Sequence, residues 1–262
     1  MRVWWLIVSV CFATLLHGES ESGLFLKGEE IFSKRCASCH QAYIPQLLLN
    51  SNYEHNNTDL NLTAPTLTEL SFALKDQVGD RKGDVESQLM EIEAFLQEYI
   101  SHPDINRSIL SADVRKHFNQ MPPMKLSEDE AEALAVYMRA FSEKMMVEHG
   151  VKRYSYAEAL QKAKEEGKII MIEGYIPFCR WCMRMDREVM VEPEVKAALE
   201  RDFVLVKMNL LTQKLPLGLQ RLGTPSFYFI KSNGKEVIDA IEGFGNKREF
   251  LDLLKQISAD AK

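Results

Sequence analysis

The chain has 262 residues, 46% of them hydrophobic and 27% charged, a balance typical of a soluble globular protein with one large or two ordinary domains. Its formal net charge of -6 at pH 7 argues against nucleic-acid binding, which needs a concentrated positive face to displace counterions from phosphates. The sequence contains no basic cluster that could form such a face, so we expect no nucleic-acid partner.

The first 18 residues have the pattern of a secretory signal peptide. Arg2 provides the positive start, residues 3–16 carry no charge, and Gly18 is a small residue suited to a cleavage site. This apolar run is shorter than the roughly 20 residues of a membrane span, which favours cleavage over retention as an anchor. We therefore expect export to the periplasm and no stable membrane span in the mature chain.

Beyond the signal, the pattern of apolar residues divides the chain into two halves. Residues 23–145 are predicted to be helical, and residues 154–262 alternate between helices and strands. Residues 146–153 are assigned to a linker between these domains. The wider stretch 142–153 is charged and contains a glycine, which suits either a short linker or the continued end of a helix.

The helical half has three stretches with the apolar spacing of amphipathic helices, at 24–34, 85–100 and 126–141. The last of these is the best defined, because a capping box that begins at Ser127 precedes its apolar stripe. Residues 41–63 lose this periodicity and are rich in asparagine, which predicts an irregular surface loop.

In the second half, apolar runs and turn residues predict helices and strands in alternation. The expected helices are 156–166, a helix from Cys179, 194–201 and 247–257, and the expected strands are 169–172, 203–208, 226–230 and 237–241. The last two strands flank an Asn-Gly pair, which favours a hairpin. This order implies a mixed central sheet with helices on both faces.

A pair of cysteines in the helical half has the spacing of a haem attachment motif. Cys36 and Cys39 stand three positions apart, and His40 follows directly. Such a motif can bind haem through two thioether bonds, with the adjacent imidazole on the iron. His40 is thus the expected first axial ligand, and Met121, in a proline-rich loop ahead of the last helix, the expected second. The two cysteines could instead be free or form half of a zinc site, which needs four ligands.

Three other residues could supply the second axial ligand. Met124 lies in the same loop as Met121 and has an equally able thioether. His102 or His117 would give bis-histidine ligation, although a lone histidine is more often a surface or packing residue. The expected set is therefore His40 with Met121.

In the order of these features, the first half resembles the class I cytochromes c. Gly28 and Phe32 precede the haem motif, and Pro65, the Met121 loop and a closing helix that includes Tyr137 follow it. The resemblance implies an all-α cytochrome c fold with one covalent haem c. It also implies that the Pro65 carbonyl accepts the His40 Nδ1 proton, and that Gly28 and Tyr137 mark a crossing of the first and last helices. The insertion at 41–63 departs from the family pattern.

A second CxxC pair, Cys179 and Cys182, precedes a predicted helix in the other half. Free backbone amides and the helix dipole favour a thiolate at Cys179, and Arg180 adds a positive charge. Cys182 can attack a mixed disulfide at Cys179 and release the partner. Met183, not histidine, follows this pair, so its thiols should stay free to cycle. The alternative is a redox-inert fold in which they merely pair.

From Ser155 to the C-terminus the chain resembles thioredoxin-like proteins. Beyond the CxxC, the matching residues are Glu173, the Thr224-Pro225 pair and Gly243 in the turn of the final strand. The resemblance implies that Glu173 is a buried carboxylate relaying a proton for the inner cysteine, and that Pro225 is a cis-proline facing the disulfide. Glu173 could instead be a solvated strand-end residue. The sequence departs from thioredoxin itself in Phe178 before the first cysteine, the Arg-Trp dipeptide and Glu in place of Asp.

Together these features predict an exported redox protein of two domains, a cytochrome c domain followed by an α/β thioredoxin-like domain. We expect the second CxxC to exchange electrons with protein thiols or disulfides, and the haem with a respiratory electron carrier. In an uncoupled fusion, the cytochrome would be an electron carrier or docking module, and the other half would reduce disulfides in protein or cytochrome assembly. A peroxidase-like enzyme is a third possibility, but Met121 would block the open iron position it needs.

Overall fold

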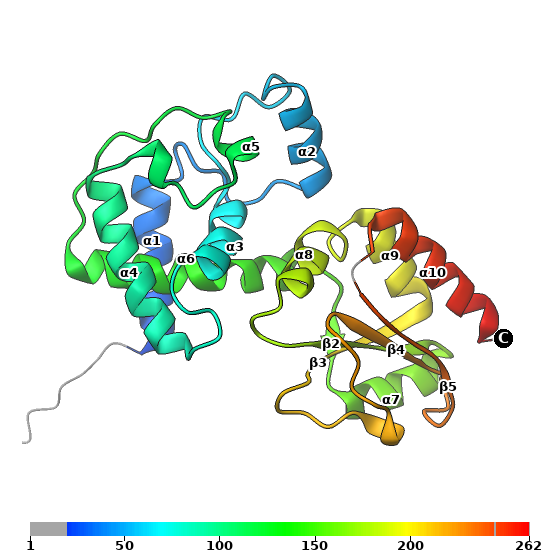
Figure 1. Cartoon of the computed structure of the whole chain (residues 1–262). Coiled ribbons are helices and arrows are strands. Elements are labelled where there is room, and N and C mark those ends of the chain that lie inside the picture. The colour runs from blue at the N-terminus through cyan, green and yellow to red at the C-terminus, as the bar shows by residue number, and fades with distance from the viewer. Residues whose placement is uncertain (1–19, 244, 262) are drawn as a thin grey trace, which may run out of the picture.

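The computed structural model describes residues 20–243 and 245–261, and the predicted signal peptide at 1–18 lies outside the described residues. A helical half precedes a half built on a sheet, and the long helix α6 runs from one toward the other (Figure 1). Within the described ranges, no helix is both long and apolar enough to span a bilayer.

The helical half consists of six α-helices and one short 3₁₀ helix among the described residues. They are α1 (Glu21–Arg35), α2 (Gln46–Glu54), α3 (Leu67–Gln77), α4 (Val85–Ser101), η1 (Ile105–Arg107), α5 (Ala112–Arg115) and α6 (Glu128–His149). The predicted helices correspond to α1, α4 and α6. The predicted capping box at Ser127 is present, because the Ser127 hydroxyl accepts from Glu130 N and the Glu130 carboxylate accepts from Ser127 N.

α1 and α6 cross at Gly28, as the sequence predicts. A Cβ atom at Gly28 would lie 2.1 Å from the Ala133 carbonyl oxygen and 2.6 Å from Tyr137 Cβ. Only a residue without a side chain allows the two helices to approach this closely. Next to the crossing, the rings of Phe32 and Tyr137 pack with their centroids 5.8 Å apart.

The prediction that residues 41–63 form an irregular surface loop is wrong for the segment that folds as α2. Asn52 of this helix is fully buried, donates to Asn57 Oδ1 at 2.8 Å and accepts from Leu60 N at 2.9 Å. Asn57, with φ of 64°, in turn donates to the Leu62 carbonyl. The asparagines therefore close a folded turn after α2, because their side chains replace missing backbone partners.

α3 has no counterpart among the predicted elements. It begins at a capping box in which Thr66 accepts from Glu69 N and Glu69 accepts from Thr66 N. Its residues Leu67, Phe72 and Leu74 are buried in the core of the helical half.

The second half has one five-stranded sheet with helices around it. Its elements are β1 (Arg153–Tyr154), α7 (Tyr156–Glu166), β2 (Ile169–Tyr175), α8 (Arg180–Glu188), α9 (Pro193–Asp202), β3 (Phe203–Asn209), η2 (Pro216–Gly218), β4 (Ser226–Ile230), β5 (Val237–Glu242) and α10 (Lys247–Asp260). The strand order is β1-β3-β2-β4-β5, with β1 and β2 parallel to β3, and with β4 antiparallel to both β2 and β5. The predicted mixed sheet is confirmed.

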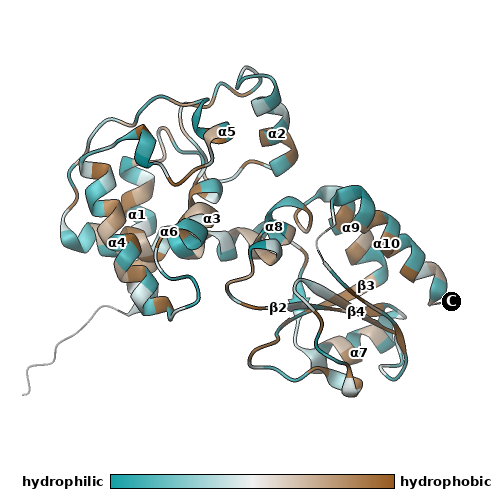
Figure 2. Ribbon diagram, in the orientation of Figure 1, coloured by the Kyte–Doolittle hydropathy of each residue, from teal (hydrophilic) through white to brown (hydrophobic). Residues whose placement is uncertain are grey.

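Alternate residues of β2 point to opposite faces of the sheet. Ile170 and Ile172 join a core with Ala159 and Ala163 of α7. Met171 joins the core on the other face, which α8, α9 and α10 cover. Figure 2 shows hydrophobic and hydrophilic residues alternating around α10, as expected for a helix that buries one side.

The residues assigned to a linker, 146–153, comprise the last turn of α6, a short connection at 150–152 and the first residue of β1. Of the two alternatives for this stretch, the structure has the continued helix, because α6 runs to His149. Met146 and Val151 are buried in the same hydrophobic cluster as Met190 and Val191 beyond α8. The two halves therefore share one apolar core at this junction.

Candidate functional site

The second CxxC forms a disulfide at the N-terminus of α8. Cys179 is the N-cap residue, its Sγ accepts from Cys182 N at 3.0 Å, and the two Cα atoms are 5.2 Å apart. One helical turn brings residues i and i+3 to the same face, so this spacing can close a short disulfide. Cys179 is 7% exposed and Cys182 3%, so the disulfide is largely buried.

The Thr224–Pro225 peptide bond is cis. β4 begins at Ser226, which pairs with Gly174 near the end of β2. Pro225 therefore lies at the end of the sheet at which the chain leaves β2 toward Cys179. This arrangement places the cis-proline and the disulfide at one end of the sheet.

Glu173 is fully buried in β2, so the alternative of a solvated strand-end residue is wrong. Arg153 Nη2 lies 3.3 Å from Glu173 Oε2, and Lys207 Nζ lies 3.0 Å from Oε1. Both cations also contact Asp186 of α8, at 3.0 and 2.6 Å. Two positive and two negative side chains thus form a compact cluster beneath α8, in which Glu173 is fully buried and the other three are largely buried.

The carboxylates of this cluster stabilise the charged forms of its two cations. Burial disfavours the charged form of Lys207, but Asp186 and Glu173 outweigh it and raise the Lys207 pKa above its usual range. The same two carboxylates raise the pKa of Arg153. Sequence reasoning missed Arg153, Asp186 and Lys207. The available signal was Lys207, a charged residue inside the otherwise apolar run of β3.

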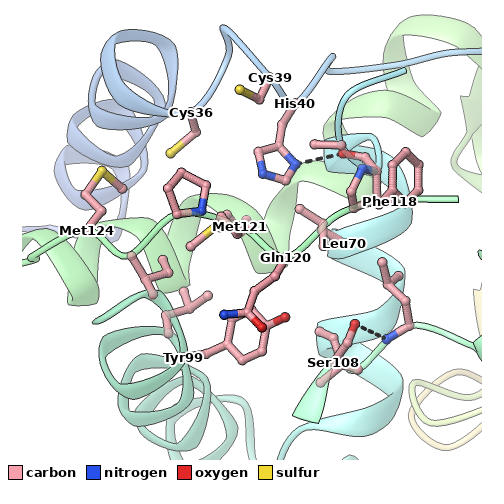
Figure 3. A pocket seen from close by; sticks show the side chains of 18 of the residues that line it. Cys36, Cys39, His40, Leu70, Tyr99, Ser108, Phe118, Gln120, Met121 and Met124 are labelled. Carbon is pink, nitrogen blue, oxygen red and sulfur yellow. Dashed lines mark hydrogen bonds between the residues drawn. The ribbon is translucent and has the colours of Figure 1, made fainter. Parts of the chain in front are cut away.

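In the helical half, the predicted haem-site residues surround one cavity of about 440 Å³. Cys36, Cys39, His40, Pro65 and Met121 all line it, and Figure 3 shows His40 and Met121 on the same cavity. Met124 lines it as well. The rest of the wall is mostly apolar and comes from α1, α3, α4, α6 and the segment 105–123 that precedes α6.

The His40 ring is fixed by a hydrogen bond between Nδ1 and the Pro65 carbonyl oxygen, 2.8 Å long. The resemblance implied this contact. The other ring nitrogen of His40, Nε2, faces the cavity (Figure 3). Burial lowers the pKa of His40, and the bond to Pro65 opposes this effect. A neutral imidazole with Nδ1 as donor leaves the lone pair of Nε2 free toward the cavity.

The two histidines considered as alternative ligands lie outside the cavity lining. His102 is the C-cap residue of α4, and His117 stacks on Tyr53 with the ring centroids 4.9 Å apart. Neither is among the residues that line the cavity. Neither Cys36 nor Cys39 is in a disulfide bond, and burial raises the pKa of the Cys36 thiol. Over residues 20–243 and 245–261, no group of three or more His, Cys, Asp or Glu side chains could hold a metal ion.

The sheet topology and the disulfide at the start of α8 define a thioredoxin-like α/β domain. Residues 156–258 match a family model described as a thioredoxin-like domain. The second half of the chain is therefore a thioredoxin-like domain.

Among known proteins, the chain is 28% identical over 106 residues to the thiol:disulfide interchange protein DsbD of Tatumella citrea, covering 38% of this chain and 18% of that protein. It is 27% identical over 154 residues to an uncharacterized protein of Aquifex aeolicus (strain VF5), a match that covers 55% of this chain and 95% of that protein. The chain thus spans less than a fifth of the length of the interchange protein. A solved thioredoxin from Thermus thermophilus is 28% identical over 43% of this chain and 90% of its own, with a TM-score of 0.40.

Proposed function

We propose that the protein is an exported, periplasmic redox protein that combines thiol–disulfide exchange at Cys179 and Cys182 with electron transfer by one covalent haem c. The disulfide at the N-terminus of α8, at the same sheet end as the cis-proline, carries the first part. The printed name of the Tatumella relative, a thiol:disulfide interchange protein, supports it. The second part is supported by the cavity that His40 and Met121 share.

The exchange begins from the reduced protein. The Cys179 thiolate attacks a disulfide of a partner protein, so one S–S bond forms as another breaks. Cys182 then attacks the mixed disulfide, restores the Cys179–Cys182 bond and releases the partner with two thiols. Two electrons and two protons pass to the partner, and a dithiol protein or a one-electron carrier must return them. Complete burial supports Glu173 as the proton relay for Cys182.

The residues around the cavity fit a covalently attached haem. Cys36 and Cys39 would form the thioether bonds, and His40 and Met121 would be the axial ligands. Pro65 orients the His40 ring and fixes its tautomer, and the apolar walls exclude water. When bound, such a haem supplies transfer of one electron at a time.

α3 favours a coupled protein over an uncoupled fusion. Leu70 and Leu74 of this helix line the cavity. Two other residues of α3 contact arginines of α8. The Phe72 ring centroid lies 5.4 Å from the Arg187 guanidinium, and the Asp76 carboxylate pairs with Arg180. Leu74 and Asp76 are only about 3 Å apart along the helix axis. One helix therefore lines the cavity and also contacts α8, the helix that begins at the disulfide. A dithiol yields two electrons and a single haem accepts one, so a radical intermediate, two partner turnovers or a second molecule would be needed.

The test uses full-length protein produced by an exporting host that attaches haem. Its denatured mass should exceed that of the processed chain by one haem, whereas Cys36→Ser with Cys39→Ser should show no addition. A reduced thioredoxin-type donor is then added anaerobically to the oxidised protein while the haem spectrum is followed. We expect haem reduction in the wild type and a loss of at least tenfold in its rate in Cys179→Ser.

Each part of the proposal has its own contrary result. A denatured mass without haem would refute the covalent cofactor and leave the thiol chemistry standing. Haem reduction that continues unchanged in Cys179→Ser would refute coupling between the two sites.

For the axial ligand, Met121→Ala should abolish the weak near-infrared band of a thioether–iron bond, because Met121 is the proposed sixth ligand. Met124→Ala is the matched control, since it removes the other thioether that lines the same cavity. The near-infrared band should remain in Met124→Ala. Loss of the band in Met124→Ala alone would assign the ligand to Met124.

A further inference from the structure

The helical half contributes a charged residue to the surroundings of the disulfide. Arg180 directly follows Cys179 and is the first residue of α8, and its Nε donates to Asp76 Oδ1. Asp76 lies near the end of α3, in the other half of the chain. The cation closest in sequence to the attacking thiol therefore has its counter-ion in a different half.

The other two arginines of α8 have a counter-ion on their own helix. Arg184 Nη2 lies 2.9 Å from Glu188 Oε2, and Arg187 Nη2 lies 2.6 Å from Glu188 Oε1. These pairs do not depend on the helical half. Arg180 differs from them because its pair crosses between the halves.

Asp76 is held in place from its own side. Arg81 Nη1 lies 2.7 Å from Asp76 Oδ1, and Gln77 donates to Asp76 Oδ2. The Asp76 side chain is 21% exposed, compared with 55% for Arg180. The carboxylate is thus the fixed member of the pair, and the longer arginine side chain is oriented toward it.

Other charges face the same seam. A small cavity of about 50 Å³ lies between Phe178 and Met183 on one side and the helical half on the other. The charged side chains that line this cavity come from the helical half and are Lys75, Arg81, Asp84 and Arg139. On the sheet side, α8 also carries Asp186 of the buried cluster. Substitution of Arg180 leaves all of these in place. Substitution of Asp76 also removes the counter-ion of Arg81, and a variant that lacks both Asp76 and Arg180 separates this effect from the one that acts through Arg180.

We propose that Asp76 is a positioning residue of the thiol site, which draws the Arg180 guanidinium toward α3 and so restrains the nucleophilic reactivity of Cys179 in the reduced protein. A nearby arginine stabilises a thiolate, and a carboxylate that pairs with this arginine weakens that effect. The inference rests on the proposed exchange function. It means that the helical half sets the reactivity of a thiol that belongs to the thioredoxin-like domain.

The test measures alkylation of reduced full-length protein by iodoacetamide from pH 5 to 9, with the Cys179 peptide quantified by mass spectrometry. Asp76→Asn should raise the Cys179 rate at pH 7 by about two- to fivefold, the range expected for a partly exposed ion pair. Arg180→Gln should lower it. The double variant should behave like Arg180→Gln alone, because Asp76 acts through Arg180.

Two further variants control for the loss of a negative charge as such and for any change at position 76. Asp113→Asn removes the same charge from an exposed residue that pairs with Lys116, and should leave the rate unchanged. Asp76→Glu keeps the charge and should remain close to wild type. A Cys179 rate that is unchanged or lower in Asp76→Asn, or additive effects in the double variant, would overturn the inference. If wild-type Cys179 instead fails to exchange with a disulfide substrate, the proposed function itself is refuted.

Discussion

Cys179→Ser is expected to lower disulfide reduction by about a thousandfold or more, because a serine hydroxyl cannot replace the attacking thiolate. Cys179 is the outer cysteine, placed at the N-cap of α8 where backbone amides favour negative charge. The measurement is the rate at which reduced full-length protein reduces a disulfide-bonded protein substrate.

Cys182→Ser provides the matched control for this experiment. It keeps the attacking thiol but removes the one that resolves the mixed disulfide, so a covalent complex through Cys179 should accumulate. The complex is detected by mass and should disappear when a small thiol is added. A complex that forms through Cys182 in Cys179→Ser instead would reverse the assignment of the two roles.

Glu173→Gln is expected to lower the free energy of unfolding by about 3 kcal/mol, because it removes a fully buried carboxylate, one of the two that compensate the largely buried Arg153 and Lys207. The side chain keeps its size, so the effect reports the lost charge and not a cavity. Urea unfolding of the oxidised protein measures it.

Glu200→Gln is the control for the buried cluster. Glu200 lies 3.9 Å from Lys196 in an exposed pair, for which we expect a change of about 0.5 kcal/mol or less. A Glu173→Gln variant as stable as this control would mean that the buried cations do not need the Glu173 charge.

Most of the thioredoxin-like domain could be predicted from local sequence patterns. Residues 169–172 of β2 and 227–230 of β4 are continuous apolar runs, and the helix before β2 ends at a clear signal, Gly167, whose φ of 68° suits glycine. The resemblance implied the burial of Glu173, but the residues that stabilise its charge could not be predicted, because only the fold brings Arg153 and Lys207 to it and Asp186 to both of them.

The helical half was harder to predict because its helices depend on one another. α2 buries only one of its three leucines, Leu49, and the buried contacts of Asn52 that support it are not revealed by any periodicity. α3 could have been found from its Thr66–Glu69 capping box. The contact of Asp76 with Arg180 links positions 104 residues apart, so only the tertiary arrangement shows that α3 reaches the disulfide helix.

The continuation of α6 into the sheet half has a consequence for folding. Met145, Met146 and Val151 are buried in a cluster that also contains Met190 and Val191, and the Tyr43 ring stacks on His149 with centroids 3.9 Å apart. A chain cut in this region would expose apolar surface on both fragments. The cooperative folding unit is therefore larger than either half, and each half acts as part of the other's hydrophobic core.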